Sequence, residues 1–411
     1  MIKIAIIGSG ITGLTLASIL QHKYDVTILE RKNVAGGLLK CKNINSSIFH
    51  TCGGHVYNSK NEIVNDWFWS IFNKDEEFIK LNNKSVIHLN NLYVDYPIEK
   101  HIWQLDKITQ SNFDRDVSWI ISNSKKQANN FAEFLENKFG KTLYDLYFRP
   151  YNEKIWKSNL SDIPLDWLDG KLPTPNINEI IECNKNHESE RNFVHSSFYY
   201  PKQNGSQFII DKLLANVKIR YNYNIQSIKI KDFKVLINNE EFDKCIFTGN
   251  IKNFVKIFTG FNIKDYIPYI NNLKYHGTTS VFCELDSNPY TWIYQPTSKH
   301  DSHRIICTGN FLHQDKFKTY GTVEFTNYIS KDQIVKQLKL MPFNPKYITH
   351  NYTKYSYPIQ DKQTRTIINS IKHKLHTFNV YLCGRFAEWE YFNMDKCIES
   401  AIKLVNYTIL E

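Results

Sequence analysis

The sequence has no Cys-x-x-Cys pair and no dense cluster of cysteines, although it contains eight cysteines in all. Neither a zinc site nor a disulfide framework is therefore indicated, no metal is expected, and the cysteines are predicted to be buried thiols in a reducing compartment. A long apolar run is also missing. The run at residues 2–7 is far too short to span a bilayer, and it leads directly into a glycine motif that a signal peptidase would destroy. We expect a cytoplasmic protein without a transmembrane segment.

Blocks of like charge are missing as well. Lys plus Arg number 51 against 41 Asp plus Glu, which gives a net charge of +10, but the basic residues are scattered along the chain. Such a charge suits nucleic acid, an anionic membrane surface or an anionic small substrate. Because neither a basic block nor a recognition motif accompanies it, we expect no nucleic-acid partner. With 42% hydrophobic and 14% aromatic residues, the composition is typical of a folded enzyme.

A glycine motif near the N-terminus predicts a dinucleotide site. The segments around it have the pattern of a strand, a helix and a second strand, at residues 2–7, 11–21 and 25–30. Gly8, Gly10 and Gly13 lie between the first strand and the helix. In such a unit the first glycine permits a tight turn, the second lets a pyrophosphate approach the backbone, and the third allows close packing of helix and strand. The helix N-terminus then faces the phosphates with free N–H groups.

Further residues favour FAD, bound non-covalently, as the dinucleotide. Glu30 ends the second strand, where its carboxylate can accept hydrogen bonds from both ribose hydroxyls and would repel the 2′-phosphate of NADP. Arg31 and a second glycine pair, Gly36 and Gly37, continue the unit as in the flavoproteins with two dinucleotide-binding domains, which this stretch resembles. NAD dehydrogenases usually lack that pair. Gly384, near the C-terminus, resembles the element that closes over the ribityl chain in those families, so both ends of the chain are expected to meet on one cofactor.

The whole chain divides into five segments of different pattern. An FAD-binding βαβ segment is followed by a mainly helical insertion with a strand at residues 92–97, a return to the FAD domain through a β-meander, a second sheet for the substrate, and a C-terminal strand and helix that close the FAD site. The boundaries predicted for these segments are 1–60, 61–175, 176–274, 275–360 and 361–411. Pro164, Pro173 and Pro175 predict an extended connector before a surface helix or loop at residues 176–191. We expect an α/β fold: a Rossmann-type FAD-binding domain with an interleaved helical insertion and a second, antiparallel-sheet substrate domain.

Four stretches resemble UDP-galactopyranose mutase and its relatives, within the wider group of amine-oxidase and protoporphyrinogen-oxidase-like flavoproteins. They are residues 48–62, 147–156, 198–205 and 384–395, in the order in which that family has them. The last is the most specific, because the mutases carry Gly-Arg there, then an aromatic-rich turn and Met-Asp. The resemblance implies an isomerase in which N5 of reduced FAD attacks the anomeric carbon of a nucleotide sugar and the ring recloses as a furanose without net redox. It also implies cell-surface polysaccharide biosynthesis and an external reductant of the flavin, and it leaves a homo-oligomer open.

The resemblance assigns roles to particular side chains. Arg385 would clamp the leaving diphosphate, for which a guanidinium fork is suited. Tyr357 matches a phosphate-binding tyrosine, although a packing role fits it nearly as well. His55 matches a loop histidine beside the flavin ring, and His50 is the weaker candidate for that role. Trp156 matches a tryptophan that lines the sugar-nucleotide cleft, and an ordinary core aromatic is the alternative.

Two positions support the flavin, and two places depart from the family. Met394 and Asp395 open the last predicted helix, whose free N–H groups can stabilise negative charge at N1 and O2 of the flavin; Asp395 could equally be a first-turn acid. Where the mutases carry an arginine after Tyr-Thr, this chain has Trp292, and residues 306–310 lack the arginine expected from a later strand. One phosphate clamp is therefore missing or rebuilt, which leaves open a different nucleotide sugar or a reaction other than the mutase reaction.

Three functions are consistent with these observations. The first is a reduced-flavin mutase of a nucleotide sugar, which the Gly-Arg and Met-Asp positions favour. The second is an FAD-dependent oxidoreductase of the amine-oxidase or protoporphyrinogen-oxidase type, whose flavin is reoxidised by oxygen or a quinone. The third is a flavin-bound structural or regulatory protein without turnover.

Overall fold

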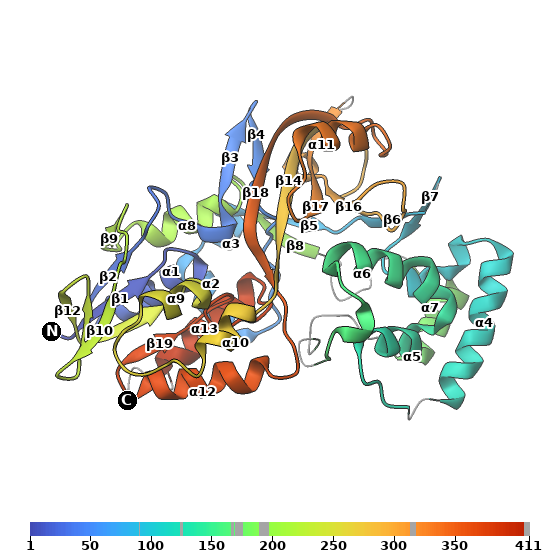
Figure 1. Cartoon of the computed structure of the whole chain (residues 1–411). Helices are drawn as coiled ribbons and strands as arrows, with labels where there is room; N and C mark the ends of the chain where they lie inside the picture. Colours follow the sequence, from blue (N-terminus) through green and yellow to red (C-terminus); the bar gives the residue numbers. More distant parts are fainter. Residues whose placement is uncertain are drawn as a thin grey trace.

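A five-stranded parallel sheet lies at one end of the molecule, at the left of Figure 1. The computed structural model describes residues 1–89, 91–123, 126–165, 168, 176–188, 197–312 and 318–406. The strand order β19-β13-β1-β2-β9 places a strand from near the C-terminus in the same sheet as the first strand of the chain. The strands are β1 (Lys3–Ile7), β2 (Asp25–Leu29), β9 (Ile219–Arg220), β13 (Lys244–Phe247) and β19 (Val380–Leu382). Parallel pairing of β1 with β2 confirms the predicted βαβ unit.

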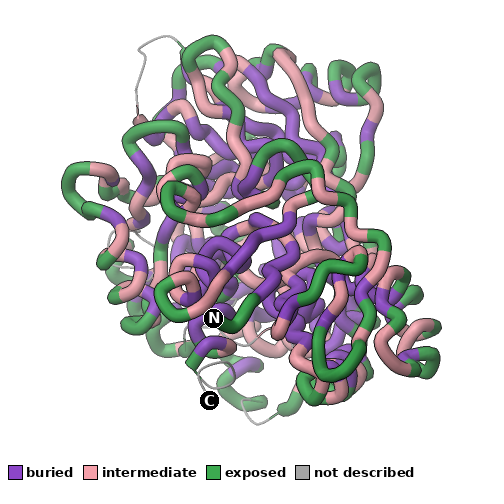
Figure 2. The backbone as a smooth tube through the Cα atoms, turned by 90° about the vertical axis from the view of Figure 1, so that its left-hand side faces the viewer, coloured by how far each residue is buried: buried purple, intermediate pink, exposed green. Residues whose placement is uncertain are grey.

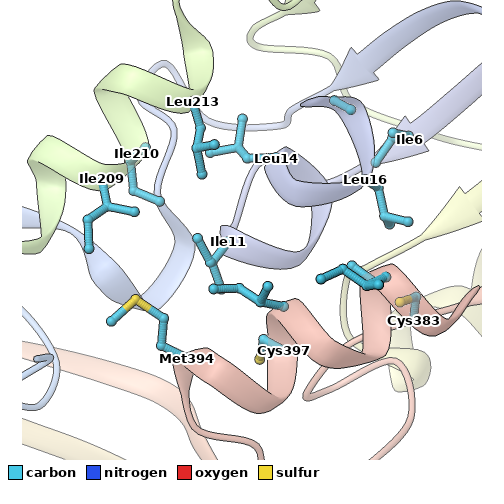
Figure 3. Close-up of a cluster of buried hydrophobic side chains, with 14 of the residues drawn as sticks. Ile6, Ile11, Leu14, Leu16, Ile209, Ile210, Leu213, Cys383, Met394 and Cys397 are labelled. Carbon is cyan, nitrogen blue, oxygen red and sulfur yellow. The ribbon is translucent and has the colours of Figure 1, made fainter. Parts of the chain in front are cut away.

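Side chains of β1 alternate between two hydrophobic layers. Ile4 and Ile6 belong to one cluster, and Ala5 and Ile7 to another, as expected for a strand that is buried on both faces. Four helices cover the first face: α1 (Ile11–Leu20), α2 (Glu62–Ile71), α8 (Ser206–Leu214) and α13 (Met394–Leu404). Figure 3 shows α1 packed between α8 and α13. The first helix of the chain is therefore held in place by segments from its middle and its C-terminal end.

The opposite face of the parallel sheet is covered by three helices and a small antiparallel sheet. These elements are α9 (Ile251–Ile257), α10 (Ile267–Asn272), α12 (Thr364–His376), β10 (Ile228–Lys231), β11 (Lys234–Ile237) and β12 (Glu240–Phe242). Of the strands predicted for the β-meander, β10 and β11 pair antiparallel, and β12, which was not predicted, pairs antiparallel with β11. The strands on either side of them, β9 and β13, instead pair into the parallel sheet.

A seven-stranded sheet forms the upper part of the molecule in Figure 1. Its order is β18-β14-β17-β16-β15-β6-β7, and its pairings are antiparallel apart from that of β15 with β6. The strands, and the helix α11 that packs on them, are β6 (Ser85–Leu89), β7 (Leu92–Asp95), β14 (Tyr275–Asp286), β15 (Trp292–Tyr294), β16 (Ser302–Ile306), β17 (Lys318–Thr326), β18 (Lys346–Pro358) and α11 (Lys331–Leu338). The predicted second, antiparallel sheet is confirmed.

The insertion contains more strands than predicted. Besides β7, which was expected, it holds β6 and also β5 (Phe78–Asn82), which pairs with β8 (Ser197–Pro201). The strand β5 pairs with β8 far along the chain, and β6 pairs with the distant β15 as well as with the adjacent β7. Tertiary context therefore contributes to their conformation, and the local pattern does not reveal it. The insertion's helices at the right of Figure 1 are α4 (Lys107–Ser122), α5 (Phe131–Leu143) and α6 (Arg149–Trp156), and α7 (Ile177–Asn186), which follows the predicted insertion, packs with them. Two smaller pieces complete the fold: the hairpin of β3 (Cys41–Ile44) with β4 (Ser47–His50), and α3 (Lys74–Glu77).

The connectors and boundaries can be compared with this architecture in part. Helix α7 confirms a helix within residues 176–191, and Pro164 is buried beside the helical insertion. Pro173, Pro175 and residues 189–191 lie outside the described residues. The five-segment division of the chain stays a proposal, because the parallel sheet takes strands from three of the five segments.

Burial follows the two sheets. In Figure 2 the buried backbone runs through the interior and the exposed backbone through the outer loops. All eight cysteines are free thiols, of which seven are buried as predicted and Cys41 is half-buried. Among the described residues, every helix is too short or too polar to cross a membrane.

Candidate cofactor and substrate site

A cavity of about 1680 Å³ is lined by the carboxyl ends of β1, β2 and β13, by the N-termini of α1 and α13, and by β15, β16 and β18. Ligands of open α/β sheets bind at the carboxyl ends of the parallel strands, so its position is that of a cofactor site. The predicted residues that line it are Gly8, Gly10, Glu30, Arg31, Gly37, His55, Arg385, Met394 and Asp395. The predicted residues that do not line it are Gly13, Gly36, Gly384, Trp156 and Tyr357. One cavity thus joins residues from both ends of the chain.

The glycine turn has the geometry that a pyrophosphate requires. A Cβ atom on Gly13 would lie 2.0 Å from the carbonyl oxygen of Gly8, so the close packing of α1 on β1 depends on this glycine. A Cβ on Gly10 would instead meet no atom nearer than Cα of Gly37, at 3.9 Å, and would point toward open space. Helix α1 begins after Gly10 without a side-chain cap. The N–H groups of its first turn therefore stay available to an anion.

Glu30 stands at the end of β2 on the same cavity. Its Oε2 accepts hydrogen bonds from the backbone N–H of Ser9 at 2.9 Å and from the Ser9 hydroxyl at 2.6 Å, and its Oε1 accepts one from the N–H of Lys32 at 2.8 Å. These bonds orient the carboxylate while leaving lone pairs for ribose hydroxyls. The Gly36 N–H donates to the Ser9 carbonyl at 2.9 Å, and its φ of +124° is one that other residues rarely adopt. The second glycine pair therefore closes against the same turn.

The C-terminal segment completes this side of the cavity. Gly384 packs so close to Thr12 of α1 that a Cβ atom would lie 2.6 Å from the Thr12 hydroxyl oxygen. Met394 and Asp395 form the first turn of α13, whose N-cap residue Asn393 makes no side-chain capping bond. Burial raises the pKa of Asp395 above its ordinary value. A second helix N-terminus without a side-chain cap thus faces the cavity, as the fit to an anionic flavin edge requires.

The two histidines near β4 differ in their surroundings. His55 lines the cavity, and its buried Nε2 has no hydrogen-bond partner among the described residues. Burial, together with the neighbouring His50 and Arg385, lowers the pKa of His55 to about 3, so its ring is neutral at pH 7. His50 is fully buried, and its Nε2 lies 2.7 Å from the Tyr200 hydroxyl. Burial lowers the pKa of His50 to about 4. His50 thus belongs to the interior behind the cavity wall.

Arg385 lies on an aromatic wall. Its guanidinium stands 4.5 Å from the ring centre of Tyr391 and 5.3 Å from that of Tyr357, and these two rings stack on each other. One of its terminal nitrogens donates to the Phe392 carbonyl at 2.8 Å and the other to the Ser356 carbonyl. Its buried Nε has no hydrogen-bond partner among the described residues. Arg385 is therefore held by backbone on one side and meets the cavity on another.

The structure places two predicted residues behind this wall. Tyr391 lines the cavity, and Tyr357 stacks on the Tyr391 ring without lining the cavity itself. The buried Trp156 contacts the Tyr391 ring edge-on, with the two ring centres 6.5 Å apart. The Trp156 carbonyl also accepts a hydrogen bond from Nε2 of His276. The predicted Tyr357 and Trp156 thus reach the cavity through Tyr391, which the sequence reasoning did not single out.

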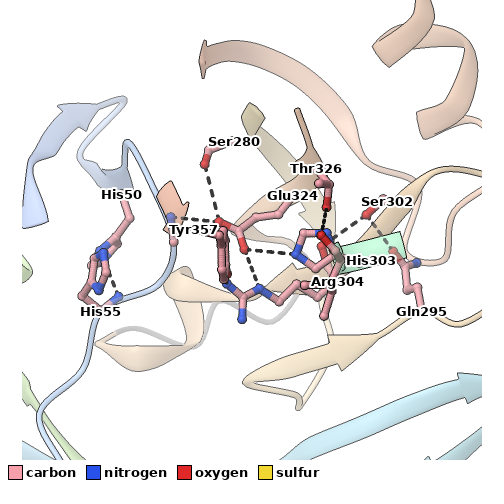
Figure 4. A network of polar contacts seen from close by, with 12 residues as sticks. His50, His55, Ser280, Gln295, Ser302, His303, Arg304, Glu324, Thr326 and Tyr357 are labelled. Carbon is pink, nitrogen blue, oxygen red and sulfur yellow. Dashed lines mark hydrogen bonds and ion pairs between the residues drawn. The ribbon is translucent and has the colours of Figure 1, made fainter. Parts of the chain in front are cut away.

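Arg304 and Glu324 are the polar pair that the sequence reasoning missed (Figure 4). Arg304 projects from β16 into the cavity wall, its Nε donates to Oε2 of Glu324 on β17, and its NH2 lies 3.4 Å from the Tyr357 hydroxyl. Burial alone would raise the pKa of Glu324, but Arg304 and His303 lower it overall, well below the ordinary value of a glutamate. Residues 302–306 read Ser-His-Arg-Ile-Ile, a mixed segment in which no local pattern singles out Arg304 or its partner on β17.

The cavity is strongly basic. Ten lysines and arginines line it, against two carboxylates, Glu30 and Asp395. The net charge of +10 that looked scattered in the sequence is therefore concentrated where an anionic ligand would enter. Trp292, Tyr294 and Phe198 add an aromatic wall. Among the described residues, no three His, Cys, Asp or Glu side chains lie together as metal ligands would.

Comparisons with known proteins agree with this geometry. Residues 6–73 match the model of the NAD(P)-binding Rossmann-like domain. The chain is 23% identical to dTDP-fucopyranose mutase of Escherichia coli, over 98% of this chain and 97% of that protein. It is 24% identical to UDP-galactopyranose mutase of Mycoplasma genitalium, over 97% of this chain and 93% of that protein. The chain is thus similar, over nearly its whole length, to proteins named as mutases of nucleotide sugars.

The mutase similarity extends to the fold. A crystal structure of reduced UDP-galactopyranose mutase superposes with a TM-score of 0.86 over 100% of this chain and 96% of that one, at 19% identity. The resemblance first seen in four short stretches is therefore confirmed along the whole chain, through both sheets and the helical insertion. A mutase-like fold with this glycine turn implies a flavin cofactor.

Proposed function

We propose that this chain is an FAD-dependent isomerase that interconverts the pyranose and furanose forms of a nucleotide-activated sugar, as a step of cell-surface polysaccharide biosynthesis. The observation that carries the proposal is the single cavity that joins the glycine turn of a dinucleotide site to the arginines Arg304 and Arg385. The names of the mutase homologues support the same reaction class. A cavity of this kind can hold a flavin and an anionic nucleotide sugar side by side.

The residues present fit FAD. Gly8, Gly10 and the uncapped N-terminus of α1 would receive the pyrophosphate, and Glu30 the ribose hydroxyls. The uncapped N-terminus of α13, at Met394 and Asp395, would stabilise negative charge on the ring. When bound and reduced, the flavin supplies a nucleophilic nitrogen for the anomeric carbon. His55, which lines the same cavity, is neutral and has a buried Nε2 without a partner among the described residues, so this atom could donate or accept a hydrogen bond there.

Arg304 takes the place of the clamp that the sequence seemed to lack. Trp292 stands where the mutases carry an arginine, but Arg304 on the neighbouring strand β16 reaches the same cavity. With Arg385, it presents two guanidinium groups to a leaving diphosphate, and Tyr357 contacts both. Fixed cations aimed at developing charge stabilise the transition state more than the ground state. We therefore propose Arg304 and Arg385 as the two halves of the clamp.

The proposed reaction also requires an electron donor for the flavin and a supply of nucleotide sugar. The flavin must be kept reduced by an external donor, since the reaction itself has no net redox. A nucleotide sugar made in the cytoplasm is the substrate class, and we expect the enzyme to work there, with a homo-oligomer left open. The basic lining of the cavity recognises the diphosphate that all such nucleotide sugars share, so the substrate is proposed as a class and not as one compound.

A substrate panel tests the proposal. Reduced holoprotein should be stabilised in thermal-shift measurements by one or a few nucleotide sugars, and by free sugars or sugar monophosphates hardly at all. The stabilising compounds should then be converted to the furanose form, which chromatography resolves from the pyranose. A protein that responds to no nucleotide sugar, in either redox state, would contradict the proposed function.

Removal of the Arg385 side chain should weaken binding of the nucleotide sugar. We expect Arg385→Ala to raise the Kd of the sugar nucleotide by about ten- to a hundredfold, because a charged hydrogen bond to phosphate is worth about 1.5–3 kcal/mol. Titration calorimetry measures the change. The exposed Arg115 of α4 offers the matched control, since Arg115→Ala removes the same charge outside the cavity. Equal Kd values for the two variants would refute the clamp role.

A second candidate function is net oxidation of a substrate by the flavin. Trp292, Tyr294 and Phe198 line the cavity with aromatic rings, and Trp292 stands where the mutases carry an arginine. This apolar part of the cavity favours the second candidate. Oxygen consumption coupled to substrate oxidation would support this candidate, whereas isomerisation without oxygen uptake supports the mutase.

A further inference from the structure

The carboxylate of Glu324 connects two parts of the site. It is fully buried on β17, and its Oε1 accepts a hydrogen bond from the backbone N–H of Gly53 at 2.8 Å. Ser280 lies 3.5 Å from the same oxygen. Its Oε2 pairs with Nε of Arg304, with Nε2 of His303 3.7 Å away (Figure 4). One carboxylate therefore contacts both the loop between β4 and α2 and the cation on β16.

Both partners of this carboxylate belong to the proposed site. Gly53 lies two residues before His55, and a Cβ on Gly53 would stand 3.4 Å from Nε2 of His55 and 4.0 Å from Oε1 of Glu324. Arg304 lines the cavity and also approaches the Tyr357 hydroxyl. Glu324 itself does not line the cavity. Any influence of Glu324 on a ligand must therefore act through Arg304 or through the loop of residues 53–55.

The charge of Glu324 is as important as its hydrogen bonds. A buried carboxylate next to a guanidinium holds that group in one orientation and neutralises part of its charge. Without the carboxylate, Arg304 would offer its full charge and more of its N–H groups to a diphosphate, in a geometry that nothing else specifies. The diphosphate would then bind more tightly, but it would be aligned less well for the reaction.

We propose that Glu324 is a positioning residue that holds Arg304 and the Gly53–His55 loop as one unit, so that the diphosphate is bound in the reacting geometry at the cost of some affinity. The proposal rests on the proposed function, and it extends that function to a residue outside the cavity wall. The substitution Glu324→Gln separates its two roles, because the amide oxygen can still accept from Gly53 but carries no charge for Arg304.

The test compares binding with turnover. UDP and dTDP serve as probes, titrated into oxidised holoprotein and followed by the visible spectrum of the flavin. For Glu324→Gln we expect the Kd of the better-binding probe to fall about tenfold, while kcat for the nucleotide sugar falls at least about tenfold. The flavin midpoint potential should shift to a more positive value, because a negative charge near the His55 loop is lost. A residue with a merely structural role would not tighten binding.

Two variants serve as controls. Glu324→Asp keeps the charge but is one methylene shorter, so it should restore the wild-type Kd and only part of kcat. Glu284→Gln, on the neighbouring strand β14, removes a half-buried carboxylate that pairs with Lys318 and Lys346 outside the cavity. It should leave Kd, kcat and potential unchanged. Unchanged or weaker probe binding in Glu324→Gln would overturn the proposal.

If Glu324→Gln alone does not fold, a double variant in which both residues of the ion pair are replaced by neutral ones provides the test. The double variant Arg304→Gln/Glu324→Gln leaves no unpaired buried charge. Its kcat and probe Kd should equal those of Arg304→Gln alone, because Glu324 acts through Arg304 and the amide keeps the Gly53 contact. A double variant much slower than Arg304→Gln would contradict the positioning role. The probe titrations need no turnover, so they judge Glu324 even if no nucleotide sugar is isomerised, an outcome that would count against the proposed function alone.

Discussion

The variant Gly13→Ala is expected to lose FAD and to unfold more easily than the wild type. A Cβ atom at this position would lie 2.0 Å from the Gly8 carbonyl oxygen, which is a backbone atom and not the end of a flexible side chain that could yield. Relieving the overlap must separate α1 from β1, so we expect a loss of about 3 kcal/mol or more in the free energy of unfolding. Urea unfolding of the apoprotein and the flavin content of the purified protein measure the two effects.

Gly10→Ala is the matched control for this prediction. Its Cβ would meet only Cα of Gly37, at 3.9 Å, which is ordinary van der Waals contact. The apoprotein should therefore keep nearly its full stability, while FAD binding falls because the methyl group occupies the approach of the pyrophosphate. If Gly10→Ala and Gly13→Ala had the same effect on apoprotein stability, the division of roles between the two glycines would be wrong.

Arg304→Leu is expected to be the most damaging single change outside the glycine turn. It removes one half of the proposed clamp and leaves Glu324, which is fully buried, without its cation. An unpaired buried charge costs about 3–5 kcal/mol, and loss of a fixed cation at the diphosphate should lower kcat/KM by at least about a hundredfold. Thermal unfolding and steady-state kinetics give the two numbers separately.

The cost of Arg304→Leu should depend on pH in a defined direction. In the wild type the pKa of Glu324 is depressed below its ordinary value of 4.5, because Arg304 and His303 outweigh burial. Its contribution is therefore complete above about pH 4.5 and is lost only as the pH falls through the depressed pKa. In Arg304→Leu burial dominates, the pKa of Glu324 rises above 4.5, and the carboxyl can take up a proton.

The stability gap between variant and wild type should therefore narrow as the pH falls from about 8 to about 5. Unfolding at both pH values checks this. Adding Glu324→Gln to Arg304→Leu should remove the pH dependence and recover part of the stability, since the buried charge is then gone. A gap that stays constant with pH, or widens on acidification, would show that Glu324 does not ionise as described.

Local patterns in the sequence carry the prediction of the proposed cofactor half of the site. The βαβ unit, its three glycines and Glu30 lie within one short stretch, where strand and helix periodicity and the turn residues all agree. Arg385 and the start of α13 were found because a contiguous segment carries them. The structure brings these two stretches to one cavity, as expected.

The substrate half depends on contacts that no local pattern contains. Arg304 and Glu324 become partners only through the register of β16 with β17, and their strands give no motif. Tyr391 lines the cavity in front of Tyr357 because the turn after Arg385 folds back on β18, which the sequence order does not specify. The strand β5 was missed for the same reason, since its partner β8 lies far along the chain, and β6 joins its sheet through the distant β15 as well as through the adjacent β7.

The central claim is that the flavin works reduced and without net redox. The most direct test divides one anaerobic preparation of holoprotein into an oxidised half and a half reduced with dithionite, and supplies both with the furanose form of the nucleotide sugar that gives the largest thermal shift. We predict pyranose product in the reduced half alone, with the flavin still reduced at the end. Product that forms in the oxidised half, together with bleaching of the flavin or uptake of oxygen after air is admitted, would contradict it.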